Sequence, residues 1–215
     1  MIANVFKMYI ERWDFFLELL MQHIGITLIA VSIITVIGLS TGILMTTNER
    51  LASIVLMVTN FLYTIPSIAL FGLLVTITGI GNKSAITALV IYGLLPMIRN
   101  TYVGIKEVDP EIIESAIGMG TTKKQLLFRI QLPLALPIIL TGFRTMVIMT
   151  IALGGIASFI GAGGLGVAIY RGISSFNPEM IIAGSLLVAS LAIIVDLLLQ
   201  KVENSLRKRI LGKRK

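Results

Sequence analysis

The chain has 215 residues, of which 56% are hydrophobic and 13% are charged, and its mean hydropathy is +0.95. Soluble domains carry about 25% charged residues, so this composition excludes an ordinary soluble domain and indicates a protein that lies in lipid. The absence of cysteine excludes disulfides and thiol catalysis, and one histidine, His23, cannot build a histidine-based metal site. The formal charge of +7 does not indicate nucleic-acid binding, because the basic residues gather between apolar runs and near the C-terminus.

Residues 1–22 mix apolar and charged side chains and offer no small-residue cleavage site, which is not the pattern of a signal peptide. We expect a separate amphipathic helix that lies on the membrane. A solvated tail is the alternative. The side chains expected to face lipid are Phe15, Phe16, Leu19 and Leu20.

Apolar runs of membrane length follow this segment, and a span needs about 20 apolar residues in helical form. The sequence predicts an all-α, polytopic membrane domain over residues 23–200 with about five spans, and a basic cytoplasmic tail over 201–215. Insertion of residues 1–22 would add a sixth span. The second span contains Pro66, which predicts a kink, and the third is short. The five predicted spans are 24–48, 51–82, 84–98, 134–159 and 180–200.

The basic residues also predict orientation, because cytoplasmic segments carry an excess of Lys and Arg. With five spans, Arg99, Lys123 and the C-terminal basic cluster share one side of the membrane, where Lys and Arg are in clear excess. We therefore expect a multi-pass protein of the bacterial cell membrane, with its N-terminus outside and its C-terminus in the cytoplasm.

Arg144 lies inside the fourth predicted span, and a charge at that depth must face protein or water. Pairing with Asp196 or with backbone carbonyls is the structural interpretation. Contact with a substrate carboxylate is the functional alternative.

Two glycine-rich segments imitate nucleotide-binding motifs. Residues 161–166 match the letters GxGxxG, but they follow an apolar run of membrane length and not the strand of a βαβ unit. Residues 79–84 lack the adjacent Gly-Lys of a phosphate-binding loop. We therefore expect no cofactor, metal or catalytic site in this chain, which is not an enzyme, and any ATP must be bound by a separate subunit.

Helix-starting and helix-ending signals alternate in residues 109–133, between the third and fourth spans. Asp109 suits a helix N-cap, Gly120 permits a left-handed turn, and Thr122 can begin a capping box. We expect a helix, a glycine turn and a second helix that ends at Pro133. Taken alone, this pattern also fits an ordinary interfacial hairpin.

Residues 114–133 resemble the EAA loop in the permease subunits of binding-protein-dependent ABC importers, which have a MetI-like fold. The family pattern is E-A-A, three residues, G, nine residues, I-x-L-P, and one departure is present, a serine in place of the first alanine. Serine is small enough to keep a close helix contact. The resemblance implies a cytoplasmic coupling helix that docks on the ATPase subunit, with the contact formed by Glu114, Ser115, Ala116, Gly120, Ile130, Leu132 and Pro133.

Residues 62–67, 94–101 and 159–166 are similar to importers of quaternary-amine osmoprotectants such as glycine betaine, choline and carnitine. Methionine importers share the architecture and remain an alternative. A secondary transporter driven by an ion gradient is the alternative from a different class. The resemblance implies a second permease subunit, identical or paralogous, a dimer of cytoplasmic ATPases, an external substrate-binding protein and surrounding lipid, but no nucleic acid.

The same resemblance implies residues along the translocation path and on the outer face. Tyr63, Pro66 and Ser67 are candidates for a kinked, pathway-facing part of the second span. An outer gate would contain Gly161, Gly163, Gly164 and Gly166, with close helix packing as the alternative role of these glycines. The candidates for docking of the binding protein are Asn82, Lys83, Arg171 and Asn177.

Overall fold

The structure is a computed structural model that describes residues 2–210, and the side chains of residues 2–208. Every regular element within this range is a helix, as the sequence predicts. In chain order the elements are α1 (Ile2–Glu11), α2 (Trp13–Met45), α3 (Glu49–Thr64), α4 (Ser67–Thr78), α5 (Asn82–Lys106), α6 (Pro110–Gly118), α7 (Lys123–Gln125), the π-helical segment η1 (Leu126–Gln131), α8 (Leu132–Gly154), the 3-10 turn η2 (Ala157–Ile160), α9 (Gly166–Ser174) and α10 (Pro178–Ile210).

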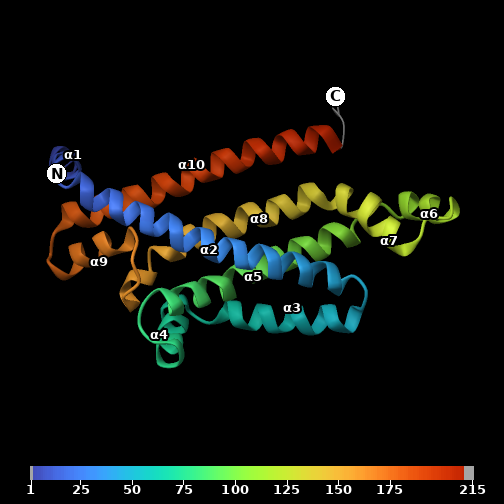
Figure 1. Cartoon of the computed structure of the whole chain (residues 1–215), viewed down its shortest axis with the longest axis horizontal. Coiled ribbons are helices and arrows are strands. Elements are labelled where there is room, and N and C mark those ends of the chain that lie inside the picture. Colours follow the sequence, from blue (N-terminus) through green and yellow to red (C-terminus); the bar gives the residue numbers. More distant parts are fainter. Residues whose placement is uncertain (1, 211–215) are drawn as a thin grey trace.

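Four long helices, α2, α5, α8 and α10, run alongside one another and form the body of the molecule (Figure 1). Each is long and apolar enough to cross a membrane, and α3 with α4 can supply a fifth span as a bent pair. This agrees with the predicted five spans, while α1, with 10 residues, is too short for a sixth. The hairpin of α6 and α7 lies at one end of the bundle, called the hairpin end below (Figure 1). The N-terminus and α9 lie at the other, called the loop end (Figure 1).

Glycines allow α5 to approach both α2 and α8 closely. A Cβ atom added at Gly42 of α2 would lie 2.5 Å from Cβ of Thr101, and one added at Gly142 of α8 would lie 2.4 Å from Cβ of Asn100. Such distances are shorter than any ordinary contact between carbon atoms. Because lipid gives helices little hydrophobic reason to associate, close van der Waals packing of this kind holds α2, α5 and α8 together.

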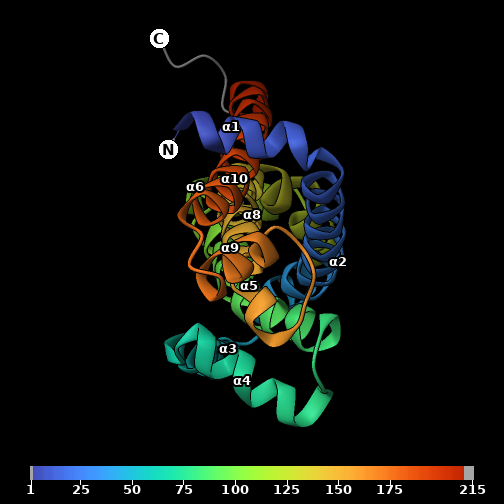
Figure 2. The ribbon, with the colours of Figure 1, turned by 90° about the vertical axis from the view of Figure 1, so that its left-hand side faces the viewer.

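The second span breaks at Pro66, as its sequence predicts. The axes of α3 and α4 differ by 100°, and both helices lie to one side of the bundle (Figure 2). The break frees the carbonyl of Ile65, and the hydroxyl of Tyr92 on α5 donates a hydrogen bond to it. A neighbouring helix thus satisfies the polar group that the kink exposes.

The N-terminal prediction is wrong in part. The first helix ends at Glu11, and residues 13–22 belong to α2, so no single helix covers residues 1–22. Short α1 crosses over α10 at the loop end (Figure 2). Phe16 and Leu19 do not face lipid, because each is only 5% exposed and packs in a core cluster with residues of α1, α9 and α10.

Two span ends also differ from the sequence prediction, and one helix was not predicted. The third span continues past residue 98 to Lys106. The exposed side chain of Arg99 ends the apolar run of the sequence, but the helix continues through it. The polar stretch after residue 166 contains a helix, α9, with an apolar face that packs on α10. The fifth span does not stop at residue 200, since α10 continues into the predicted tail. Residues 211–215 of that tail lie outside the described range.

We predict that Gly142→Ala lowers the thermal midpoint of the detergent-purified chain, because the added methyl group forces α5 and α8 apart. Overpacking of this kind costs about 1–3 kcal/mol of stability. Gly25→Ala on α2 is the matched control, since no atom lies within 4 Å of its added Cβ. Thermal melts followed by circular dichroism measure both variants, and equal midpoints would contradict the proposed close packing.

Candidate functional site

The predicted helix-turn-helix is present at the hairpin end. The carboxylate of Asp109 accepts a hydrogen bond from the amide of Glu111 at 2.9 Å and so caps α6. Gly120 has a φ of +83°, the left-handed conformation in which a side chain is strained. Thr122 and Gln125 then form a reciprocal capping box that begins the return helix. Local chemistry therefore fixes both arms and the turn between them.

The return arm does not end at Pro133, contrary to the sequence prediction. Helical structure continues without interruption from Lys123 to Gly154, so α7, η1 and α8 form one rod. Pro133 lacks a donor hydrogen, and the wider turn of η1 immediately before it lets the chain pass this position without a break. The hairpin is therefore rigidly joined to a membrane span.

The residues of the EAA-like pattern gather on this hairpin. Ala116 is 2% exposed, and a surface hollow of about 440 Å³ lies between it and Ile130 on the facing arm. Glu114, Ser115, Gly120 and Pro133 are exposed, while Ile130 and Leu132 are half-buried. The structure therefore leaves most of this set accessible at the hairpin end.

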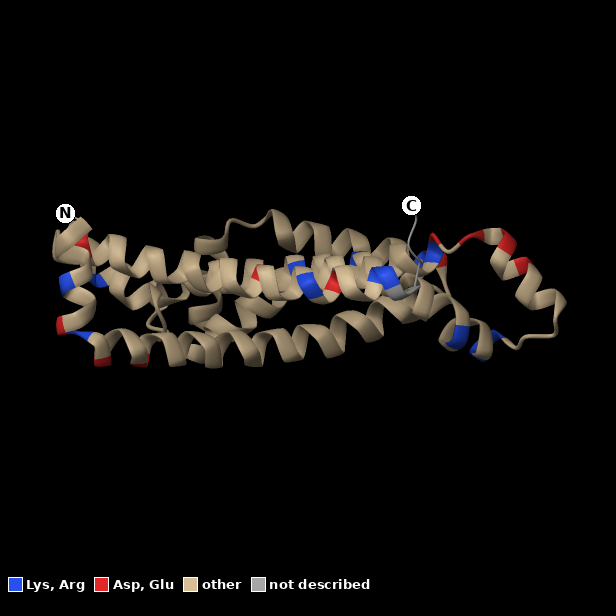
Figure 3. Ribbon diagram, turned by 90° about the horizontal axis from the view of Figure 1, so that it is seen from above, with Lys and Arg blue, Asp and Glu red and all other residues tan. Residues whose placement is uncertain are grey.

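Charge on the hairpin is separated between its arms (Figure 3). The α6 arm carries acidic side chains, and the α7–η1 arm carries basic ones, among them Lys123, Lys124 and Arg129. The tip is apolar, with Ile117 56% exposed and Met119 79% exposed. An exposed apolar tip between charged flanks is a surface suited to a protein partner.

The glycine-rich loop at the loop end is held by side chains from two other helices. The amide of Gly163 donates to Oδ1 of Asn82 at 3.2 Å, and the amide of Gly164 donates to Oε1 of Gln22 at 3.1 Å. The next amide, that of Leu165, donates to Nδ1 of His23 at 3.3 Å. Sequence analysis identified neither Gln22 nor His23, because each lies 142 residues from its partner.

Gly166 differs from the other predicted gate residues. It begins α9, and a Cβ atom there would lie 1.9 Å from the carbonyl oxygen of Gly155. Its side-chain hydrogen is therefore required by packing between the end of α8 and the start of α9. Gly161 and Gly164, in contrast, have φ values of +77° and +99° and shape the loop itself.

The three candidates around the kink lie together at the bend between α3 and α4. Tyr63 is 45% exposed, and its hydroxyl donates to Sδ of Met149 at 3.4 Å. Its ring packs edge-on against that of Tyr92, with 5.9 Å between centroids. Pro66 is exposed and Ser67 half-buried. The bend therefore presents an aromatic ring and small polar groups on one side of the bundle.

Of the four docking candidates, two have exposed cationic side chains and two have amides engaged within the chain. Lys83 and Arg171 are exposed, and the Arg171 guanidinium lies over the ring of Phe15 at 5.2 Å from its centroid. Asn82 holds the glycine-rich loop, and Asn177 caps α10 by accepting from the amide of Met180 at 3.0 Å.

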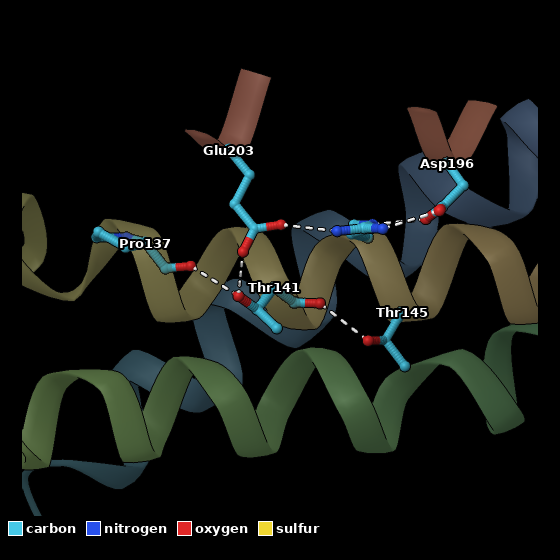
Figure 4. Close-up of polar contacts among 6 residues, drawn as sticks. Pro137, Thr141, Thr145, Asp196 and Glu203 are labelled. Carbon is cyan, nitrogen blue, oxygen red and sulfur yellow. Dashed lines mark hydrogen bonds and ion pairs between the residues drawn. The ribbon is translucent and has the colours of Figure 1, made fainter. Parts of the chain in front are cut away.

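Arg144 is paired inside the bundle, as its structural interpretation predicts. Its Nε and Nη2 donate to the two carboxylate oxygens of Asp196 at 2.5 and 2.8 Å (Figure 4). Its Nη1 also donates to Glu203 at 3.4 Å, and the hydroxyl of Thr141 donates to the same carboxylate at 2.7 Å. Side-chain exposures of 24%, 30% and 16% for Arg144, Asp196 and Glu203 indicate a partly buried network.

Sequence analysis missed Glu203 because it placed the end of the last span at residue 200. Glu203 lies seven positions after Asp196, so both carboxylates fall on one face of α10. Glu203 and Thr141 also line a hollow of about 430 Å³, whose far side is formed by Glu107, Asp109 and Ile112. The network therefore adjoins the base of the hairpin.

Comparison with known proteins places this geometry in a family. Residues 34–208 match the family described as the binding-protein-dependent transport system inner membrane component. The chain is 40% identical over 182 residues to the carnitine transport permease protein OpuCB of Listeria monocytogenes, covering 85% of this chain and 84% of that protein. It is 40% identical over 199 residues to the osmoprotectant import permease protein OsmW of Salmonella typhimurium, covering 90% and 93%.

A longer relative combines two functions in one protein. The chain is 45% identical over 164 residues to the ergothioneine transport permease/ergothioneine binding protein EgtU of Helicobacter pylori. The match covers 76% of this chain but spans only 30% of that protein. Among solved structures, an inward-facing MetNI methionine ABC transporter superposes with a TM-score of 0.79, covering 89% of this chain and 95% of that one. Its identity of 22% shows a shared fold.

We predict that Arg144→Met and Asp196→Leu each destabilise the chain, and that the double variant loses less stability than the sum of the two single losses. Arg144→Met leaves two carboxylates without their cation, and Asp196→Leu leaves Arg144 with only the longer bond to Glu203, whereas the double change removes both members of the bidentate pair. Removal of one partner from a fully buried pair costs about 3–5 kcal/mol, and the partial exposure here places the expected loss near the lower end.

Thermal midpoints of the four proteins provide the double-mutant cycle, and additive effects would contradict direct pairing. Lys106→Met is the control, because Lys106 and Glu49 lie 3.6 Å apart on the exposed surface. Such exposed pairs contribute about 0–1 kcal/mol.

Proposed function

The chain belongs to the family of binding-protein-dependent transport system inner membrane components, and we propose that it forms the membrane path for a quaternary-ammonium osmoprotectant. It is a permease subunit of an ABC importer and not an enzyme. The observation that carries the substrate proposal is 40% identity over nearly the full length of a carnitine permease and an osmoprotectant permease.

The names of the relatives share one chemical feature. Carnitine, choline and glycine betaine each carry a trimethylammonium group, and so does ergothioneine. Three of them, all but choline, also carry a carboxylate and are zwitterions. We favour this class over methionine, since the methionine transporter structures support a shared fold at 22–23% identity.

The electrostatics of the bundle fit a substrate of low net charge. Arg144 is occupied by Asp196 and Glu203, so it offers no free cation to a substrate carboxylate. The glycine-rich loop carries no charge, and exposed Tyr63 offers an aromatic face that attracts a quaternary ammonium group. The same pairing argues against an ion-driven transporter, which would need an intramembrane acid free to bind an ion or a proton.

The hairpin is the proposed contact for a dimer of separate ATPase subunits, which would bind the ATP. Glu114, Ser115 and Gly120 are accessible there, and the apolar tip can enter a groove on the partner. Because the return arm continues into α8, motion of the ATPase would be passed directly to a membrane span.

The proposed orientation puts the hairpin end in the cytoplasm and the loop end outside, following the excess of basic residues near the hairpin and on the end of α10. A substrate-binding protein would then dock at the loop end near Lys83 and Arg171. The path would form between this subunit and a second permease, identical or paralogous, in the bacterial cell membrane.

Uptake into proteoliposomes tests this function directly. The chain is co-purified with its ATPase and binding protein, reconstituted with internal ATP, and supplied with labelled carnitine, choline, glycine betaine, ergothioneine or methionine. We expect ATP-dependent uptake of at least one trimethylammonium compound and none of methionine. Uptake of methionine alone would contradict the proposed substrate class. Uptake in the absence of ATP would contradict an ABC mechanism.

We predict that Gly120→Val abolishes co-purification of the ATPase, whereas Gly120→Asn retains it. The left-handed backbone at Gly120 is strained for valine but tolerated by asparagine, at a difference of order 1–2 kcal/mol. No atom lies within 4 Å of a Cβ added at Gly120. A difference between the two variants would therefore come from backbone strain and not from a steric clash inside the chain. Mass spectrometry of the affinity-purified complexes measures ATPase recovery, and equal losses in both variants would contradict a role for the turn.

A further inference from the structure

We propose that His23, assisted by Gln22, is a latch that holds the glycine-rich loop of residues 161–166 in its closed position. His23 is thus a positioning residue for transport. The proposal rests on the proposed function and on the expectation from sequence that this loop forms part of an outer gate, and it adds the side chains that hold the loop in place.

His23 uses both ring nitrogens inside the bundle. The ring is 1% exposed, and its Nδ1 lies 3.3 Å from the amide nitrogen of Leu165. An amide can only donate, so Nδ1 is the acceptor and the ring proton sits on Nε2. Nε2 then donates to the carbonyl of Ile151 at 3.0 Å. A neutral imidazole in one tautomer therefore bridges the loop and the end of α8.

The loop presents a row of donors to this part of the bundle. The amides of three consecutive residues, 163, 164 and 165, point to side-chain acceptors on Asn82, Gln22 and His23. Two of the acceptors belong to α2 and one to α5. The loop itself connects η2 with α9, so all three bonds join different segments of the chain.

The glycines fit closely around the two α2 side chains. A Cβ atom at Gly164 would lie 3.0 Å from Nδ1 of His23, and one at Gly154 would lie 3.1 Å from Cε1 of the same ring. A Cβ atom at Gly163 would lie 2.4 Å from Oε1 of Gln22. Glycine at these three positions lets the backbone approach His23 and Gln22 closely enough for the hydrogen bonds to form.

The latch is placed where motion of the hairpin would reach it. The rod that begins at Lys123 on the hairpin ends at Gly154, and the carbonyl that accepts from His23 belongs to Ile151 near that end. A tilt of this rod relative to α2 changes the distance between Ile151 and His23. The same displacement would move His23 relative to Leu165 and weaken the hydrogen bond between them. Motion of the ATPase could therefore release the loop, and this release would need no charged side chain in the path.

Side-chain shape gives a test that a merely structural histidine would not pass. Asparagine places an acceptor oxygen near the position of Nδ1 but cannot reach Ile151. Glutamine places an amide near the position of Nε2 but offers no acceptor to Leu165. Asparagine is the shorter side chain and leaves the larger void, so loss of packing alone would make His23→Asn the more disruptive variant, the opposite of the order that the latch predicts.

The chain contains no cysteine, so Ala162→Cys supplies a unique thiol in the loop. Ala162 is 3% exposed, and a membrane-impermeant maleimide should therefore label this thiol slowly while the loop is closed. We expect labelling to be faster by about tenfold, the factor for one lost hydrogen bond, in His23→Ala and His23→Gln. His23→Asn should label as slowly as the parent.

Thr27→Ala is the control, because Thr27 is buried on α2 one turn from His23 and its hydroxyl has no partner within the described residues. Its labelling rate should match the parent. Equal rates for His23→Asn and His23→Ala, or an unchanged rate for His23→Ala, would overturn the latch.

The complete transporter then separates the two levels of the proposal. In the complex with the ATPase, His23→Ala should hydrolyse ATP before the binding protein is added, and it should lose uptake once the binding protein is present. His23→Asn should behave as the parent in both measurements. Faster labelling with unchanged uptake would overturn the gating role of the latch but leave the permease function intact. Absence of ATP-dependent uptake in the parent itself would instead refute the proposed function. The relative labelling rates of the His23 variants would still test the latch in that case.

Discussion

The structure depends on one constraint, which is that backbone polar groups within a membrane need partners from the protein. Two of the places where the chain leaves helical geometry are the break at Pro66 and the glycine-rich loop. In both places a neighbouring helix supplies the missing partner, through Tyr92 at the kink and through Gln22, His23 and Asn82 at the loop. These irregular segments are therefore specified structures, and their partners determine how far each can move.

A second consequence concerns charge. One guanidinium in the bundle meets two carboxylates, and all three groups lie between α8 and α10. This arrangement satisfies Arg144 and fixes the outer helix α10 on the rod that carries the hairpin. It also leaves the candidate path with aromatic, small and uncharged polar groups, which suits a zwitterion that gains little from a strong fixed charge. In the proposed function, the structural charges therefore lie apart from the groups that would line the path.

Much of the fold follows from the sequence because hydropathy, proline and capping residues act locally. The presence of the spans, the kink at Pro66 and the cap at Asp109 are of this kind, and the structure confirms them, although it moves several span boundaries. The errors arise where tertiary contacts decide. Phe16 and Leu19 are apolar on an apparently amphipathic segment, and only the neighbouring helices make them core residues. Glu203 was not predicted as a partner of Arg144, because a span predicted from hydropathy ends where charged residues begin. The helix itself continues past that point.

The candidate site divides along the same line. The hairpin could be predicted because its caps, turn and family pattern are adjacent in sequence, whereas the partners of the loop are separated from it by up to 142 residues. Yet one continuous rod from Lys123 to Gly154 connects these two regions. A π-helical turn before Pro133 carries the helix past this residue without a break, so in the proposed mechanism a force applied at the hairpin would be transmitted along α8. In that mechanism the connection between the two ends of the bundle would depend on this turn as much as on the residues proposed to contact the ATPase.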